Sequence, residues 1–286
     1  MKNNTGKPFR YHSSFFHIVG IFAAGMMILY HNVHYFVHAV VLYIIRQPMK
    51  DNSEKGVMLL IYVMSDLHGC YDKYMKMMDQ LNLQKDDTLY VLGDVVDRGP
   101  DGIKILLDMY DRDNIIFLRG NHEQTAMKVL RCMFDSGAGF NDDELVPMIQ
   151  LWMLDGGNTT LEQFIGIPAC DKKKVLTYLW HSVISAETEV NGKKYLLAHT
   201  VPEKEIMLGK DKCEPDDFIL GEPDYDLRYY DDRIIVTGHT PTGLIEKAYQ
   251  GRIYIKNNHI AVDCGAFFKD GRLGCICLDT MEEYYV

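Results

Sequence analysis

Three short polar motifs, each placed directly after an apolar, strand-like run, constrain the fold of this chain more than any other feature. The runs are residues 59–64, 88–92 and 115–118, and the motifs are SDLHG (65–69), GDVVDRG (93–99) and RGNHE (119–123). Two later runs, 195–198 and 234–237, end in turns that contain His199 and His239. Because the carboxyl ends of parallel strands meet at one edge of a sheet, we expect all five turns to converge on one pocket.

The segments between and after the runs predict an α/β fold. Apolar residues at helical spacing over 71–81 and 102–110 predict two crossover helices. Four further segments predict a helical cap insertion within residues 123–198: 123–133, 144–154, 159–164 and 172–185. Three late segments predict antiparallel strands that finish a second sheet: 253–254, 260–263 and 273–278. The expected architecture is two mixed β-sheets packed as a sandwich and flanked by helices.

The residue types in the five turns suit divalent cations. The candidate ligands are two carboxylates, one amide and three imidazoles: Asp66, His68, Asp94, Asn121, His199 and His239. This mixture suits manganese, iron or zinc better than a metal that prefers thiolates. Asp66 and His68 are two residues apart, so both can lean over the tip of one strand. If Asp94 bridges two ions about 3.5–4 Å apart, the pair can clamp the attacking and leaving oxygens of a phosphoryl transfer.

Charged residues beside the candidate ligands fit the same chemistry. Arg98 and Arg119 each lie within four positions of a candidate ligand, and a guanidinium group binds phosphoryl oxygens well. His122 follows Asn121 directly, and Asp97 could orient His122 as an imidazolium that protonates a leaving alkoxide. A hydroxide between the two metal ions would serve as nucleophile, so the chemistry requires no serine or cysteine.

Each of these residues has an ordinary structural interpretation when it is taken alone. Glycine followed by aspartate or asparagine is typical of turns, and a single arginine or histidine is commonly a surface or buried structural residue. The joint occurrence of all of them at five strand ends favours the functional interpretation. His181 and His259 have no comparable context and are expected to be structural.

The series D-x-H-G, G-D-x-x-D-R-G and R-G-N-H-E, followed by two isolated histidines, resembles the PPP-type calcineurin-like metallophosphoesterases over roughly residues 58–286. The resemblance implies the αββα metallophosphoesterase fold and two divalent ions, manganese first, with iron or zinc as alternatives. It implies one metal on Asp66, His68 and Asp94, and a second on Asp94, Asn121, His199 and His239. It also implies phosphate contacts from Arg98, Arg119 and Arg228, and a general acid at His122 paired with Asp97.

The substrate class stays open between two kinds of phosphoesterase. Arg119 directly before residues 120–123 resembles the serine/threonine phosphoprotein phosphatases more than the symmetrical dinucleoside tetraphosphatases. We therefore expect a phosphoprotein phosphatase, with a dinucleoside tetraphosphatase-like hydrolase as the alternative. A membrane-tethered metal-binding scaffold is the non-enzyme alternative. A scaffold would be expected to lack Asp94, Arg98, Asn121 or His122, and all four are present.

Composition restricts the partners and the compartment. A net charge of −10 argues against a general nucleic-acid binder, so the expected partner is a phosphorylated protein or a small phosphorylated compound. The seven cysteines are odd in number and scattered, which is typical of reduced thiols in the cytosol.

Residues 1–57 differ from the rest of the chain. No Asp, Glu, Lys or Arg occurs from residue 15 to residue 45, and Lys2, Lys7 and Arg10 come before that segment. The pattern predicts a membrane-associated segment at 15–45, followed by a polar linker that leads to a catalytic domain over 58–286. The alternative is that the natural polypeptide starts near Met58 and the upstream residues are over-extended translation.

Overall fold

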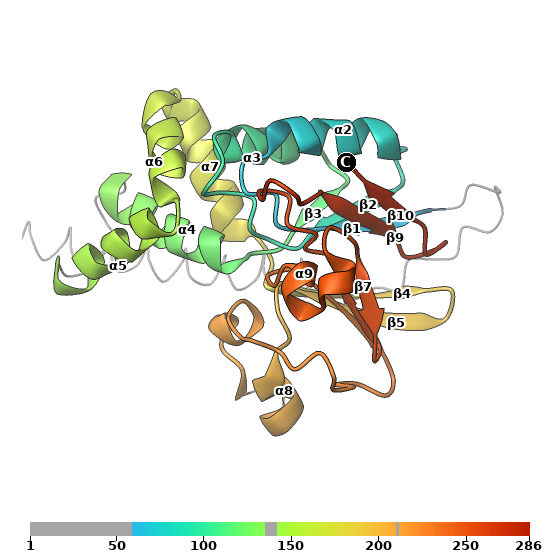
Figure 1. The fold of residues 1–286 in the computed structure, drawn as a ribbon. Helices are drawn as coiled ribbons and strands as arrows, with labels where there is room; N and C mark the ends of the chain where they lie inside the picture. Colours follow the sequence, from blue (N-terminus) through green and yellow to red (C-terminus); the bar gives the residue numbers. More distant parts are fainter. Residues whose placement is uncertain (1–58, 135–141, 210–211) are drawn as a thin grey trace, which may run out of the picture. The chain divides into compact units, whose positions relative to one another are not determined.

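The structure is a computed structural model that describes residues 59–134, 142–209 and 212–286 (Figure 1). Two five-stranded mixed sheets form its centre, with strand orders β10-β9-β1-β2-β3 and β4-β5-β6-β8-β7. This confirms the predicted fold class. The predicted N-terminal extension, with its membrane-associated segment, lies outside the described residues. In the part that is described, no helix is both long enough and apolar enough to cross a membrane.

The first sheet carries the three opening motifs. Its strands are β1 (Ile61–Met64), β2 (Thr88–Val91), β3 (Ile115–Phe117), β9 (Gly274–Cys277) and β10 (Glu283–Tyr285). β1, β2 and β3 are parallel neighbours, so their carboxyl ends reach the same edge. β9 was expected in the second sheet, but it pairs antiparallel with β1. The reason is that every residue of β9 is buried, which suits a strand between two neighbours.

The second sheet carries the two later histidines. Its strands are β4 (Ser185–Val190), β5 (Lys193–Ala198), β6 (Ile234–Thr237), β7 (Tyr254–Lys256) and β8 (His259–Ala261). β5, β6 and β8 run parallel, so the residues that follow β5 and β6 share an edge. β4 and β10 were not predicted from the sequence.

The helices largely follow the predicted segments. They are α2 (Tyr71–Leu81), α3 (Gly102–Tyr110), α4 (Asn121–Phe134), α5 (Asp142–Leu154), α6 (Gly157–Gly166) and α7 (Ala169–His181). Four short turns of helix come later: α8 (Glu203–Leu208), the 3₁₀ helices η2 (Pro215–Phe218) and η3 (Lys247–Tyr249), and α9 (Thr242–Ile245). α7 ends earlier than predicted because Val183 pairs with Leu118 and β4 begins at Ser185.

The apolar faces of the helices close the core over the first sheet. α2 buries Tyr74, Met77, Met78 and Leu81, a spacing that places all four on one side of the helix. Met77 and Met78 are therefore packing residues of the core. α4, α5, α6 and α7 form the predicted helical insertion and gather beside α3 (Figure 1).

Candidate active site

Several residues in the strand-end turns have an unusual backbone conformation. Six non-glycine residues in them have a positive φ: Asp66, His68, Asp94, Asp97, Arg98 and His239. Such conformations are uncommon for residues with a side chain and are found preferentially at functional sites. The turns also approach each other closely, since a Cβ on Gly93 would lie 2.4 Å from the backbone nitrogen of Gly120. Glycine at this point is what allows the second and third motifs to meet.

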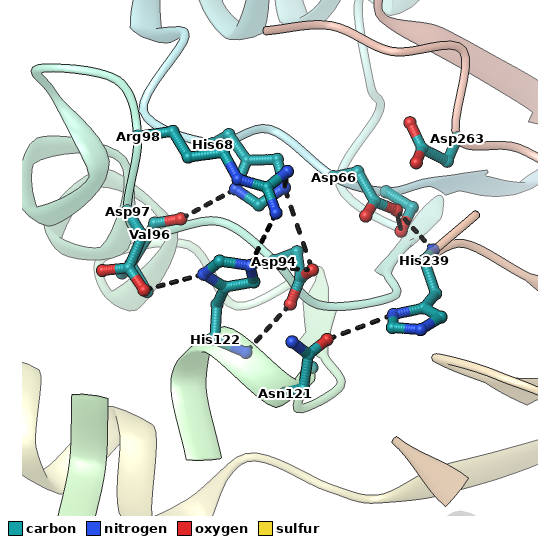
Figure 2. Close-up of polar contacts among 12 residues, drawn as sticks. Asp66, His68, Asp94, Val96, Asp97, Arg98, Asn121, His122, His239 and Asp263 are labelled. Atoms are coloured by element: carbon teal, nitrogen blue, oxygen red, sulfur yellow. Dashed lines mark hydrogen bonds and ion pairs between the residues drawn. The ribbon is translucent and has the colours of Figure 1, made fainter. Parts of the chain in front are cut away.

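The structure brings four of the six predicted ligands, His68, Asp94, His199 and His239, together with His122 (Figure 2). Candidate ligand atoms of His68, Asp94 and His122 lie within 4.8 Å of one another, and so do those of Asp94, His199 and His239. Asp94 belongs to both groups and is 2% exposed. Its Oδ2 is 3.8 Å from Nε2 of His68 and 3.4 Å from Nε2 of His199. This arrangement suits a carboxylate that is shared by two cation sites.

The ring orientation of two histidines fits metal binding. Nδ1 of His68 lies 3.0 Å from the carbonyl oxygen of Val96, and Nδ1 of His199 lies 2.7 Å from that of Leu92. A carbonyl oxygen only accepts hydrogen bonds, so each Nδ1 carries a hydrogen. In the neutral form of either ring, the Nε2 lone pair then points into the cluster, which is how proteins orient metal-binding histidines.

Acceptor atoms converge on one point beside Asp94. Nε2 of His199 lies 3.0 Å from Oδ1 of Asn121 and 3.1 Å from Nδ1 of His239. Oδ1 of Asn121 is also 3.1 Å from Nδ1 of His239. In the neutral rings these nitrogens and the amide oxygen offer lone pairs to the same point. The donor set therefore fits a divalent cation of the borderline type.

Two buried carboxylates lie close to this cluster. Oδ2 of Asp66 accepts hydrogen bonds from the Ser65 hydroxyl and, at 3.0 Å, from the backbone N–H of His239. Burial and the neighbouring Asp94 raise the pKa of Asp66 to about 6. Asp263, 3% exposed, lies beside Asp66 (Figure 2), and burial together with Asp66 raises the pKa of Asp263 well above its usual value. Burial disfavours the charged form of both carboxylates, and a cation between them and Asp94 would offset that cost.

Sequence reasoning missed Asp263, although a signal was present. The residue stands just after β8, a strand that runs parallel to β6. It therefore occupies the same kind of strand-end position as the five turns recognised from the sequence.

Charges at the centre of the cluster stabilise one another. Burial by itself raises the pKa of Asp94, but His199 and His122 hold it well below the usual value. Burial lowers the pKa of His199, but Asp94 outweighs this effect and raises it to about 10. A histidine must be neutral to bind a metal, so protons and metal are expected to compete at His199.

His122 has the contacts of a proton donor. Its Nδ1 donates to Oδ2 of Asp97 at 2.8 Å, and both side chains are buried. Burial lowers the pKa of His122, but Asp94 and Asp97 outweigh this effect and raise it to about 9. The imidazolium form is therefore favoured near neutral pH, which suits a general acid.

Two residues of the helical insertion fix Asp97. The indole N–H of Trp152 donates to Oδ2 of Asp97 at 2.8 Å, and the hydroxyl of Thr160 donates to Oδ1 at 2.6 Å. The backbone N–H of Asp97 donates back to the same hydroxyl at 2.9 Å. Sequence reasoning did not assign either role. The signal available was that both residues flank the Gly156-Gly157 pair.

Glu123, the last residue of the third motif, accepts hydrogen bonds from the backbone of the second and third motifs. Its Oε2 accepts the backbone N–H groups of Asp94 at 2.7 Å and Gly120 at 3.0 Å. Its Oε1 accepts those of Val95 at 2.8 Å and Val96 at 3.1 Å. This fully buried carboxylate ties the second motif to the third and so holds the turn that contains Asp94.

Arg98 is the predicted phosphate-binding arginine that lies at the cluster. Its Nη1 is 2.9 Å from Nε2 of His68, and its Nη2 is 3.1 Å from Nε2 of His122 (Figure 2). The side chain is 29% exposed, so it can meet a ligand that arrives from solvent.

Comparison with known proteins agrees with this geometry. Residues 59–243 match the calcineurin-like phosphoesterase family. The chain belongs to this family. Calcineurin-like phosphoesterases are hydrolases that use divalent metals, and the described residues contain two His/Asp groups able to bind them.

The relatives of this calcineurin-like phosphoesterase include symmetrical tetraphosphatases and serine/threonine-protein phosphatases. The chain is 36% identical over 139 residues to a symmetrical bis(5'-nucleosyl)-tetraphosphatase of Buchnera aphidicola subsp. Acyrthosiphon pisum (strain 5A), covering 46% of this chain and 47% of that protein. It is 26% identical over 159 residues to serine/threonine-protein phosphatase 2 of Escherichia coli (strain K12), covering 54% and 64%. The chain spans about half the length, or less, of the first curated relatives it matches.

A solved structure shows the same fold. A putative diadenosine tetraphosphatase superposes with a TM-score of 0.55 at 18% sequence identity, over 81% of this chain and 94% of that one. At this level of identity the match confirms the fold of the phosphoesterase.

The structure does not bring Arg119 to the cluster, contrary to the expectation from the sequence. Its Nε donates to Oγ of Ser182 at 2.9 Å, and its Nη2 donates to the carbonyl oxygens of Leu179 and Trp180, both at 3.1 Å. These carbonyls end α7, where a cation is favourable to the helix dipole. Arg119 therefore joins α7 to the third motif of the phosphoesterase.

Arg228 also lies away from the cluster. Its side chain is 53% exposed, and its Nε pairs with Oδ1 of Asp231 at 3.3 Å. It lies in the loop before β6, where it also bonds to the carbonyl oxygen of Tyr230. Of the three arginines predicted to bind phosphate, Arg98 contacts the histidines of the cluster, whereas the hydrogen bonds of Arg119 and Arg228 lead elsewhere.

Proposed function

We propose that this calcineurin-like phosphoesterase hydrolyses phosphomonoesters, as a serine/threonine phosphoprotein phosphatase that uses two divalent ions, manganese first. The observation that carries the proposal is the shared position of Asp94 between two groups, His68–Asp94–His122 and Asp94–His199–His239, in which Asp97 holds His122 by a hydrogen bond. Asp66, His68 and Asp94 would hold one ion. Asp94, Asn121, His199 and His239 would hold the other.

When bound, the ions supply Lewis-acid charge and make water nucleophilic near neutral pH. The chain's own residues orient the substrate and supply the proton. Arg98 binds the phosphoryl oxygens and so orients the phosphorus toward the cluster. His122 presents Nε2 to the leaving oxygen and gives it a proton, while Asp97 holds Nδ1 and keeps the ring in place.

A pocket beside His239 favours a protein substrate over a polyphosphate. It has a volume of about 570 Å³, and its walls include Glu222, Asp224, Asp226 and Tyr225. Three carboxylates would repel the several negative charges of a dinucleoside tetraphosphate. A phosphorylated side chain on a peptide carries its charge at a single point, which Arg98 and the cluster would bind.

A symmetrical dinucleoside tetraphosphatase is the second candidate. The 36% identity to the Buchnera enzyme over 139 residues favours it. Both candidates carry out the same chemistry at phosphorus. They differ in the part of the substrate to which the phosphoryl group is attached.

The test is hydrolysis of p-nitrophenyl phosphate, a phosphoserine peptide and diadenosine tetraphosphate by the full chain, with Mn²⁺ and after chelation. We expect activity on the first two that chelation abolishes. Asp94→Asn should bind less Mn²⁺ and lose far more than tenfold in rate, because the shared carboxylate is removed. Faster turnover of diadenosine tetraphosphate would establish the second candidate instead. A chain that is inactive with every divalent metal would refute both.

We also propose that residues 58–286 are the catalytic domain and that it works in a reducing compartment. All seven cysteines are free, and none forms a disulfide. The net charge of −10 favours a phosphorylated protein over a nucleic acid as the partner.

A further inference from the structure

Asp155 places a third charged group at the mouth of the site. It follows α5, and its side chain is 54% exposed. Its Oδ1 is 3.2 Å from Nη2 of Arg98, and its Oδ2 is 3.4 Å from Nε2 of His122. The carboxylate therefore spans the two groups that the proposed function gives to the substrate.

A phosphoryl group needs the same two atoms. One of its oxygens would bind Nη2 of Arg98, and the leaving oxygen would face Nε2 of His122. A carboxylate and a phosphoryl group are both anionic acceptors, so they cannot share these donors without strong repulsion. One must leave when the other arrives.

The side chain of Asp155 can leave without a change in the backbone. The backbone N–H of Asp155 bonds to the carbonyl oxygens of Leu151 and Trp152, at 3.1 and 3.2 Å. The next residue, Gly156, is fixed by its carbonyl oxygen, which accepts the backbone N–H of Arg98 at 3.1 Å. Within the described ranges, Arg98 and His122 are the polar side chains that the carboxylate contacts. Rotation into solvent breaks those two contacts and leaves the backbone bonds intact.

We infer that Asp155 is a counter-ion of Arg98 that the substrate's phosphoryl group displaces, and that its charge weakens phosphate binding in proportion to the charge of the phosphate. The inference rests on the proposed function, which places the phosphoryl group at Arg98 and His122. Two consequences follow. Product phosphate is released more easily, and a multiply charged phosphate is disfavoured relative to a singly charged one.

The expected effect follows from the charges. Two unit charges about 4 Å apart in water-like surroundings repel by an amount equal to about fivefold in binding, and salt reduces this. Asp155→Asn keeps the shape of the side chain and an oxygen that can accept from Arg98, but removes the charge. It should tighten binding of a monoanionic diester by up to about fivefold, and that of dianionic inorganic phosphate by more, because the repulsion grows with the charge.

The experiment compares the full chain with Asp155→Asn and Asp155→Ala, all loaded with Mn²⁺. Asp113→Asn is the matched control, since Asp113 is exposed and stands before β3, at the edge of the sheet opposite the site. Calorimetry gives the Kd of inorganic phosphate. Kinetics give its inhibition constant and the KM values of p-nitrophenyl phosphate and the monoanionic bis(p-nitrophenyl) phosphate.

Tighter phosphate binding in both Asp155 variants, but not in the control, would support the inference. Unchanged binding in Asp155→Asn would overturn it. Weaker binding in Asp155→Ala with no change in Asp155→Asn would also overturn it, because Asp155 would then be a tether that positions Arg98. Calorimetry separates this result from a failure of the proposed function, because phosphate binding can be measured even if the chain hydrolyses none of the substrates.

Discussion

Replacement of Thr160 by valine tests the link between the helical insertion and the proposed general acid. Valine has nearly the same shape as threonine but lacks the hydroxyl, which donates to Oδ1 of Asp97 and accepts the backbone N–H of Asp97. Both residues are 0% exposed, so water cannot take over either bond. Loss of the bond to the carboxylate costs about 1.5–3 kcal/mol, and the unpaired N–H adds about 1–3 kcal/mol. We therefore expect the free energy of unfolding to fall by about 2.5–6 kcal/mol.

The same change should affect catalysis selectively. With Oδ1 released, Asp97 keeps the bonds from His122 and Trp152 to its other oxygen, so His122 is held less firmly. General-acid catalysis is worth about 10²–10⁴ in rate, so a partial loss should lower kcat by about tenfold to a hundredfold for phenyl esters with poor leaving groups. Esters whose leaving group needs no proton should be affected little.

The assay is urea unfolding, together with kcat for a series of aryl phosphates of rising leaving-group pKa. Thr160→Ser is the matched control, because it keeps the hydroxyl and should restore both properties. Equal unfolding free energies for the serine and valine variants would refute the assigned hydrogen bonds. An equal loss of kcat across all leaving groups would refute the link to the general acid.

Two further predictions concern residues outside the catalytic cluster. Burial lowers the pKa of His259 from 6.5 to about 4, so the unfolded chain binds a proton that the folded chain rejects. Stability should therefore be complete above pH 6.5 and fall by about 3 kcal/mol as the pH drops toward 4, and urea titrations should show a smaller fall in His259→Phe. Arg119→Ala should lower the thermal midpoint, because it removes the bonds to the end of α7, and should leave the KM for p-nitrophenyl phosphate nearly unchanged. A large rise in KM with unaltered stability would instead place Arg119 at the phosphate.

Much of the fold was predictable because its signals are local. The helical spacing of α2 and α3 and the apolar runs of β1, β2 and β3 identified these elements from the sequence. β9 was assigned to the wrong sheet, because a run buried on both faces does not reveal which neighbour it pairs with. β4 and β10 have few buried residues and gave no clear pattern.

The site was predictable where a short side chain follows a strand end. It was not predictable where a long side chain can turn away from its strand end. Asp94, Asn121, His199 and His239 were recognised by their position after strands, and the structure brings them together. Arg119 has the same kind of position, but its side chain turns to a helix end that lies about 60 residues further along the chain. Sequence proximity to a ligand indicates where a backbone lies and leaves the direction of a long, flexible side chain undetermined.

The positions of Trp152 and Thr160 change the interpretation of the helical insertion. Asp97 and Arg98 are adjacent, both have a positive φ, and both are bonded to the junction of α5 and α6. A strained turn keeps its conformation only where surrounding contacts determine it. Since those contacts come from the insertion, the insertion is part of the machinery that sets the proton donor and the phosphate-binding arginine. A substitution at this junction is therefore expected to change the chemistry at phosphorus as well as the choice of substrate.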